Sequence, residues 1–150
     1  MVALNEAAIT PYQAIEAGHI FQWLKNGRCT ELPHDPSVVG AIADNIINFC
    51  RLTQEAKKIN KEKGLVASSD AENASFFADI MIKNLNFQRQ KKGLELLTIE
   101  TALESTIKVM ETVKEGGDAN INDIKIAASY INRRHVPLLP QYRSESQDDD

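Results

Sequence analysis

Histidine and cysteine side chains are the first candidates for chemistry in this sequence, because both bind transition metals. The candidates are His19, Cys29, His34 and Cys50. Zinc sites usually place such ligands in pairs at short, fixed spacings. Here Cys29 and His34 are five residues apart, the other two lie on flanking segments, and neither C-x-x-C nor H-x-x-x-H occurs. We therefore predict no metal site, with Cys50 as a small core residue.

The sequence also lacks the patterns of common catalytic sites. G-x-S-x-G, which would hold a nucleophilic serine on a strained turn, is absent. Gly116-Gly117 has neither a lysine nor a preceding strand, so we predict a helix end there rather than a phosphate site. Glu100 and Glu104 share a helical face, but no E-x-x-H accompanies them, which favours a solvated face. We expect no enzyme and no cofactor; a carboxylate-dependent enzyme, the remaining alternative, would need two acids and a histidine converging in a pocket.

The middle of the chain is a basic island in an acidic protein. The whole chain has a net charge of −4, whereas residues 51–93 hold nine cations and five acids, giving 9 − 5 = +4. Clustered lysines and arginines neutralise phosphates and support nucleic-acid binding. The predicted nucleic-acid-binding residues are Arg51, Lys57, Lys58, Lys61, Lys63, Arg89, Lys91 and Lys92. An antiparallel pairing of the two helices that carry them would gather these cations into one stripe.

A second interpretation of the basic island stays open. Cations near helix C-termini complement the helix dipole and keep a surface solvated without binding any ligand. Glu55 and Glu62 also dilute the stripe. Arg133, Arg134 and His135, at the end of the last predicted helix, have the same ambiguity.

Size and composition predict one soluble globular domain. The chain has 150 residues, of which 43% are hydrophobic and 25% charged, enough to bury a core without a disulfide or a metal. No run of about 18 apolar residues is present, and the first residues lack the pattern of a secretory signal. Two cysteines do not make a disulfide framework, so we expect a reducing, cytoplasmic location, or the host cytoplasm for a viral protein.

Five helices and no strand are predicted, because capping residues precede each apolar periodic segment and glycine or proline follows it. Thr10-Pro11 and Asp35-Pro36 are two such starts, and Gly93 is one such end. The helices are expected over about residues 11–25, 36–63, 69–92, 98–115 and 121–132. This predicts an all-α bundle over residues 1–143, with the first half of its second helix buried almost all round, and a disordered acidic tail over residues 144–150.

A short amphipathic helix with a proline-containing exit, ANINDIKIAASYINRRHVP at residues 119–137, follows the acidic fourth helix. This pattern, over about residues 99–140, resembles the ending of some tailed-phage small terminase subunits. The chain departs from them in lacking a clear helix-turn-helix near the N-terminus. It also has Asn132-Arg133-Arg134-His135 where those proteins have Lys-Asp-Asn-Gly. The resemblance implies a helical, ring-forming, non-enzymatic subunit that recognises viral DNA and passes it to a packaging motor.

These observations predict a non-catalytic subunit of an oligomeric assembly that contacts nucleic acid through the basic island, with viral DNA packaging as its context. The alternative is a protein-binding adaptor or inhibitor that uses no nucleic acid. It would grip a partner through the second helix or through the seam of the fourth, formed by Leu103, Met110 and Val113. Neither hypothesis involves a membrane.

Overall fold

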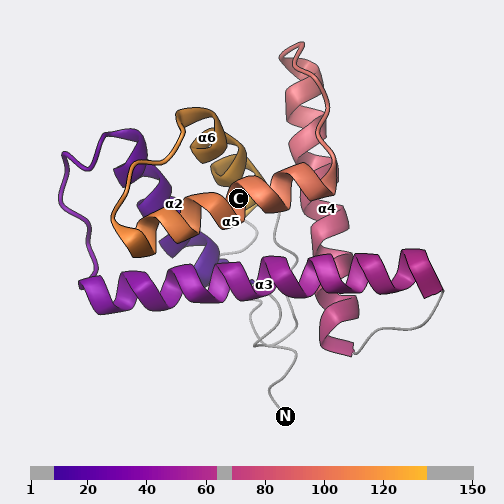
Figure 1. Ribbon diagram of the computed structural model, residues 1–150. Coiled ribbons are helices and arrows are strands. Elements are labelled where there is room, and N and C mark those ends of the chain that lie inside the picture. The colour runs from indigo at the N-terminus through magenta and orange to yellow at the C-terminus, as the bar shows by residue number, and fades with distance from the viewer. Residues whose placement is uncertain (1–8, 64–68, 135–150) are drawn as a thin grey trace, which may run out of the picture.

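The computed structural model describes residues 9–63 and 69–134, with side chains over 9–58 and 74–134. Within these ranges the chain forms five helices and no strand (Figure 1). They are α2 (Pro11–Lys25), α3 (Pro36–Lys63), α4 (Ser69–Lys91), α5 (Ile99–Glu115) and α6 (Ile121–Tyr130). The all-α prediction is confirmed, and the helix bounds agree to within two residues. The predicted tail at 144–150 lies outside the described residues.

Local hydrogen bonds explain where these helices begin and end. Thr10 and Gln13 form the predicted capping box of α2, each side chain accepting from the other's backbone N–H at 3.1 Å. Both α2 and α4 stop at a glycine with positive φ, Gly27 at 65° and Gly93 at 73°. At the second of these, the N–H of Leu94 donates to a carbonyl five residues earlier at 2.9 Å, which completes a Schellman motif.

The long helix α3 organises the packing. It makes its most extensive contacts with α5 and α4, while α6 covers α5 and α2 packs on α6 and α3. In Figure 1, α5 lies above α3, and α4 crosses α3 steeply. The antiparallel pairing of α3 with α4, which would have gathered the predicted cations into one stripe, is therefore not found. The distal end of α4 extends away from α3 instead of returning along it.

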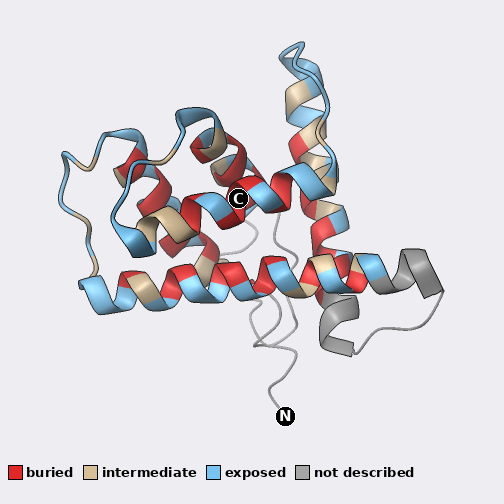
Figure 2. Ribbon diagram, in the orientation of Figure 1, coloured by how far each residue is buried: buried red, intermediate tan, exposed pale blue. Residues whose placement is uncertain are grey.

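The core follows the apolar faces of the helices. On α3, Ile46 and Cys50 are completely buried, whereas Asp44, Asn45 and Asn48 are exposed. Figure 2 shows the same alternation of buried and exposed positions along the helix. The prediction that the first half of this helix is buried almost all round is wrong, because these polar residues give it a solvent face. None of the helices in the described part of the chain is long and apolar enough to cross a membrane.

Candidate functional site

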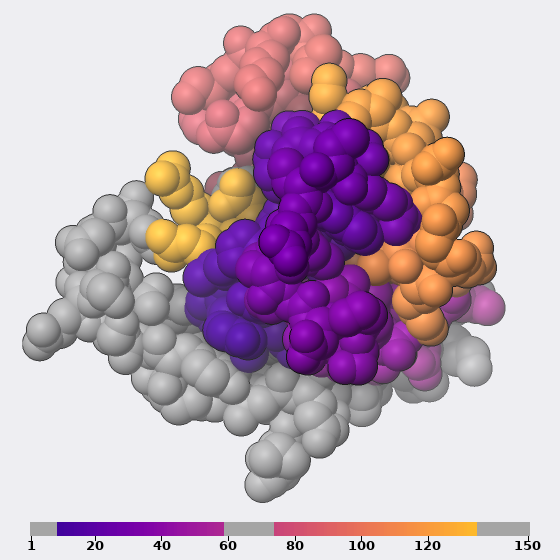
Figure 3. Space-filling view, turned by 90° about the vertical axis from the view of Figure 1, so that its left-hand side faces the viewer, coloured from indigo at the N-terminus to yellow at the C-terminus, as the bar shows by residue number. Residues whose placement is uncertain are grey.

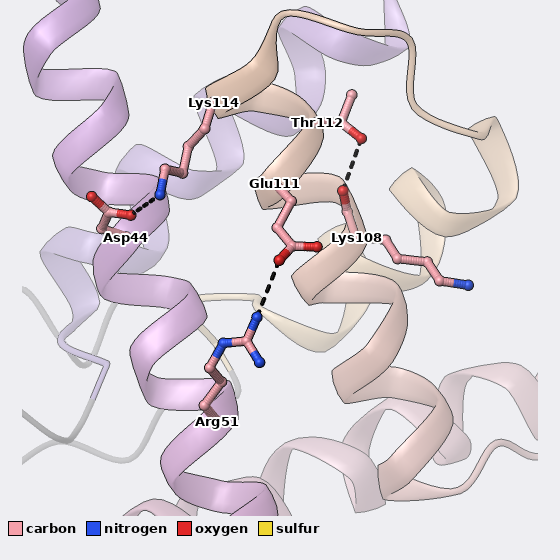
Figure 4. A network of polar contacts seen from close by, with 6 residues as sticks. All are labelled: Asp44, Arg51, Lys108, Glu111, Thr112 and Lys114. Carbon is pink, nitrogen blue, oxygen red and sulfur yellow. Dashed lines mark hydrogen bonds and ion pairs between the residues drawn. The ribbon is translucent and has the colours of Figure 1, made fainter.

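The predicted basic stripe begins on α3, where two of its cations are held in ion pairs. The Nη2 atom of Arg51 lies 3.1 Å from Oε2 of Glu111 on α5 (Figure 4). The Nζ atom of Lys57 lies 2.6 Å from Oδ1 of Asp79 on α4. Both pairs join α3 to a neighbouring helix and satisfy charges that a phosphate group would otherwise meet.

The other predicted cations lie in separate places. Lys58 is exposed on α3, and the side chains of Lys61 and Lys63 lie outside the described residues. Of the remaining three, Arg89 and Lys91 lie at the distal end of α4, and Lys92 follows directly after the helix. Because α4 crosses α3, this end is remote from the cations of α3 (Figure 1). The structure therefore does not bring the predicted set together into one stripe.

A different cationic surface forms between the ends of α2 and α4 and the middle of α6. A pocket of about 540 Å³ there is lined by four cations and by no acidic residue. We call it the cationic pocket, and its cations are Lys25, Arg89, Lys92 and Lys125. The Nε–H of Arg89 donates to the carbonyl oxygen of Glu95 at 2.6 Å, which fixes the guanidinium at the pocket. Sequence reasoning missed Lys25 and Lys125 because each lies in an acidic part of the chain.

Three side chains with metal-ligand chemistry meet where the connector between α2 and α3 folds back on α2. Glu16 and His19 lie on α2, and His34 lies near the end of the connector. Oε2 of Glu16 is paired with Nε2 of His34, and Nδ1 of His19 lies 3.5 Å from the same nitrogen. One ligand atom from each residue lies within 4.8 Å of the other two. We call these three residues the histidine–glutamate cluster.

Arg28 holds the connector in place. Its guanidinium lies 4.6 Å from the ring centroid of Trp23, and its Nη2 donates to the carbonyl oxygen of Gly117 at 2.5 Å. Its φ of 61° turns the chain sharply after α2. Figure 3 shows α2, the connector and the start of α3 on the face turned toward the viewer. The start of the connector is thus anchored to α2 through Trp23 and to the loop after α5 through Gly117.

The signal for the cluster was present in the sequence. Glu16 and His19 form an E-x-x-H pattern, whose three-residue spacing places both side chains on one helical face. The position of His34 was not readable, because it depends on how the connector folds. Of the two cysteines, Cys29 is exposed and outside the cluster. Cys50 is buried in the core, as predicted. Burial raises the pKa of its thiol far above the ordinary value, and the nearby positive charge of Arg51 offsets only part of this rise.

Of the three residues of the apolar seam proposed for a partner helix, only Val113 reaches the surface, and it is half-buried. Leu103 and Met110 are completely buried and belong to the core, so this part of the adaptor hypothesis is wrong. Exposed apolar side chains instead occur near the distal end of α4 and the loop after it. Phe87, Leu94 and Leu96 are 49–56% exposed there.

Comparison with known proteins gives no match, whether with family models, with curated proteins or with solved structures. The similarity of residues 99–140 to small terminase subunits therefore stays a prediction.

Proposed function

We propose that the protein is a non-catalytic helical subunit that binds the phosphate backbone of a nucleic acid at the cationic pocket. The observation that carries this proposal is the convergence of four cations from three segments, with no acid among the lining residues. The chain as a whole has a net charge of −4, so an acid-free cluster departs from its average composition. Phosphate neutralisation by lysine and arginine supplies most sequence-independent affinity for nucleic acids.

The position of Lys125 argues against a purely local explanation of this charge. Lys25 is the last residue of α2, and Arg89 lies in the last turn of α4, so both also complement helix dipoles. Lys125 lies in the middle of α6 and complements no helix end. Its presence beside the other cations supports a surface selected for an anion.

The proposal includes an oligomeric assembly, with viral DNA packaging as its context. This part draws support from the sequence resemblance of residues 99–140. Light scattering with and without duplex DNA tests it directly. A ring-sized particle supports a packaging subunit, whereas a monomer in both conditions contradicts this part of the proposal.

A salt titration of binding to a labelled generic duplex tests the pocket. For about four phosphate contacts, the logarithm of the association constant should fall against the logarithm of salt concentration with a slope of about −3.6. Lys92→Ala and Lys125→Ala should each weaken binding and reduce the slope by about 0.9. Lys108→Ala is the matched control, because this exposed lysine lies on α5 (Figure 4) outside the cationic pocket.

Three results would contradict the proposal. Absence of binding at about 50 mM salt, where phosphate contacts are strong, would exclude nucleic-acid binding. An equal effect of Lys108→Ala would mean that only the overall charge matters. A loss confined to Arg51→Ala and Lys57→Ala would place the interface on α3, despite the ion pairs there.

A protein partner is the second candidate, favoured by the exposed apolar side chains Phe87, Leu94 and Leu96. Exposed apolar clusters of this kind are typical of protein interfaces. Self-association that is lost in Phe87→Ser would support this use of the α4 end. Monomeric behaviour at every concentration, with unchanged stability of the variant, would count against self-association there.

A further inference from the structure

The histidine–glutamate cluster has the composition of a transition-metal site. Its ligands are an E-x-x-H pair on α2, Glu16 and His19, and a third residue, His34, from the connector. Two imidazoles and one carboxylate with a free fourth position form the ligand set of many zinc sites. Oxygen-only ligand sets, which suit calcium and magnesium, are not what this cluster offers.

The spacing of the two imidazole nitrogens in the cluster fits a single ion, whereas Glu16 and His34 lie closer together than two ligands of one ion and have to separate. With metal–ligand bonds of about 2.0–2.2 Å, the ligand atoms of a tetrahedral site lie about 3.4 Å apart. Nδ1 of His19 and Nε2 of His34 are 3.5 Å apart, which is already close to this value. All three ligand atoms lie within 4.8 Å of one another, so small side-chain rotations complete the geometry.

Hydrogen bonds alone account poorly for this arrangement, because too few protons are available on the imidazole nitrogens. Nε2 of His34 carries at most one proton, and its pairing with Glu16 directs that proton to the carboxylate. Nδ1 of His19, 3.5 Å away, can then share that proton only as the long branch of a bifurcated hydrogen bond. A cation that accepts one lone pair from each residue gives all three atoms a reason to converge.

Burial supports the same conclusion. The Glu16 side chain is only 7% exposed although it is a carboxylate on a helix, and burying a carboxylate without a compensating charge is costly. His34 is 15% exposed, and His19 lies on the surface. The cluster therefore has a buried acid at its base and an open rim, through which an ion can enter.

A pocket adjoins the cluster on the connector side. It has a volume of about 470 Å³, and its lining includes His34, Trp23 and Val113. Of the three cluster residues His34 lines this pocket, so a water molecule or a small ligand can reach the cluster from the side of His34. We propose that Glu16, His19 and His34 bind a divalent transition-metal ion of the zinc class, with the fourth position left to solvent.

Isothermal titration of the full-length chain with zinc chloride tests this proposal. We expect one ion per chain, and more than about tenfold weaker binding in His19→Ala, since even an outer-shell change can cost that much. His19 is exposed, so its replacement leaves the core intact. His135→Ala is the control, because His135 is the one histidine of the sequence that is not among the three residues of the cluster.

Long-range proton–nitrogen spectra of the imidazoles give a second readout. Zinc should shift the ring nitrogens of His19 and His34 and leave those of His135 unchanged. His34→Ala and Glu16→Gln should also lose the ion while keeping the helical circular dichroism spectrum. The proposal is overturned by the absence of zinc binding to the wild type, by unchanged affinity in His19→Ala, or by loss of binding in His135→Ala. If either of the buried variants fails to fold, the exposed His19 variant decides the question.

Discussion

Tyr130 ends α6 with a buried hydroxyl that no described residue satisfies. Its side chain is completely buried, and its Oη has no hydrogen-bond partner among the described residues. A buried hydroxyl without a partner costs roughly 1–3 kcal/mol. Tyr130→Phe removes that hydroxyl and keeps the packing of the ring. We therefore expect the variant to be more stable than the wild type by about 1 kcal/mol.

Urea unfolding followed by circular dichroism measures this difference. The midpoint should rise at an unchanged m value, and Tm should rise by about 2–4 °C for each kcal/mol in a chain of this size. Tyr12→Phe is the matched control, because Tyr12 is 69% exposed and its hydroxyl is already solvated. Destabilisation by Tyr130→Phe of about 1 kcal/mol or more, without a similar effect at Tyr12, would refute the reasoning, since the hydroxyl would then have a partner.

The same residue sets an alkaline limit on stability. Burial raises the pKa of Tyr130 well above its ordinary value of 10.0, with smaller contributions from Cys50 and Asp79. Above pH 10 the unfolded chain loses this proton and the folded chain keeps it, so the full stability is present below that pH and decreases as pH rises. The slope is about 1.4 kcal/mol per pH unit for each such group. Cys50, whose thiol pKa is also raised by burial, adds a similar slope from a lower pH. In Tyr130→Phe, the free energy of unfolding should decrease above pH 10 only with the slope that Cys50 contributes.

Three further predictions concern the fold. Asn86→Ala should destabilise the protein by roughly 1–3 kcal/mol in urea unfolding. The Asn86 amide donates to the Leu97 carbonyl and accepts from the Leu97 N–H, both at 2.9 Å, and the variant loses both bonds. An unchanged urea midpoint would mean that these two bonds do not stabilise the fold. A thiol reagent should label the exposed Cys29 at once and the buried Cys50 only on unfolding, so two fast-reacting thiols by mass spectrometry would contradict the burial. Gly116→Ala should cost about 1 kcal/mol in thermal unfolding, because Gly116 ends α5 at a φ of 80°, and a gain in Tm would argue against this backbone conformation.

The helices could be predicted because their signals are local. Thr10 and Gln13 are three residues apart, and the bonds that start α2 form between them alone. Gly93 ends α4 through its own backbone conformation, whatever the rest of the molecule does. Such features depend on neighbouring residues, which the sequence places side by side.

The relations between helices could not be predicted in the same way. Nothing near Lys57 in the sequence indicates that its partner is Asp79, because the pair exists only where α4 crosses α3. Lys25 and Lys125 are isolated cations until α2 and α6 pack together. The E-x-x-H pattern of Glu16 was readable, but its third ligand comes from a connector whose path is set by tertiary contacts.

The net charge of a segment therefore indicates a binding surface only where its cations are not held in ion pairs within the fold. The +4 of residues 51–93 suggests one attractive surface, but Arg51 and Lys57 are used to hold α5 and α4 against α3. Exposed ion pairs of this kind contribute only about 0–1 kcal/mol each, so they matter more for the angle at which helices meet than for stability. A further pair, between Lys114 on α5 and Asp44 nearer the start of α3, has an N–O distance of 2.6 Å and also joins these two helices (Figure 4). The cations that line the cationic pocket share it with no carboxylate, and only charge of that kind retains its attraction for a phosphate. By this argument, Lys92 and Lys125 are better candidates for nucleic-acid contact than any cation in the ion pairs of α3.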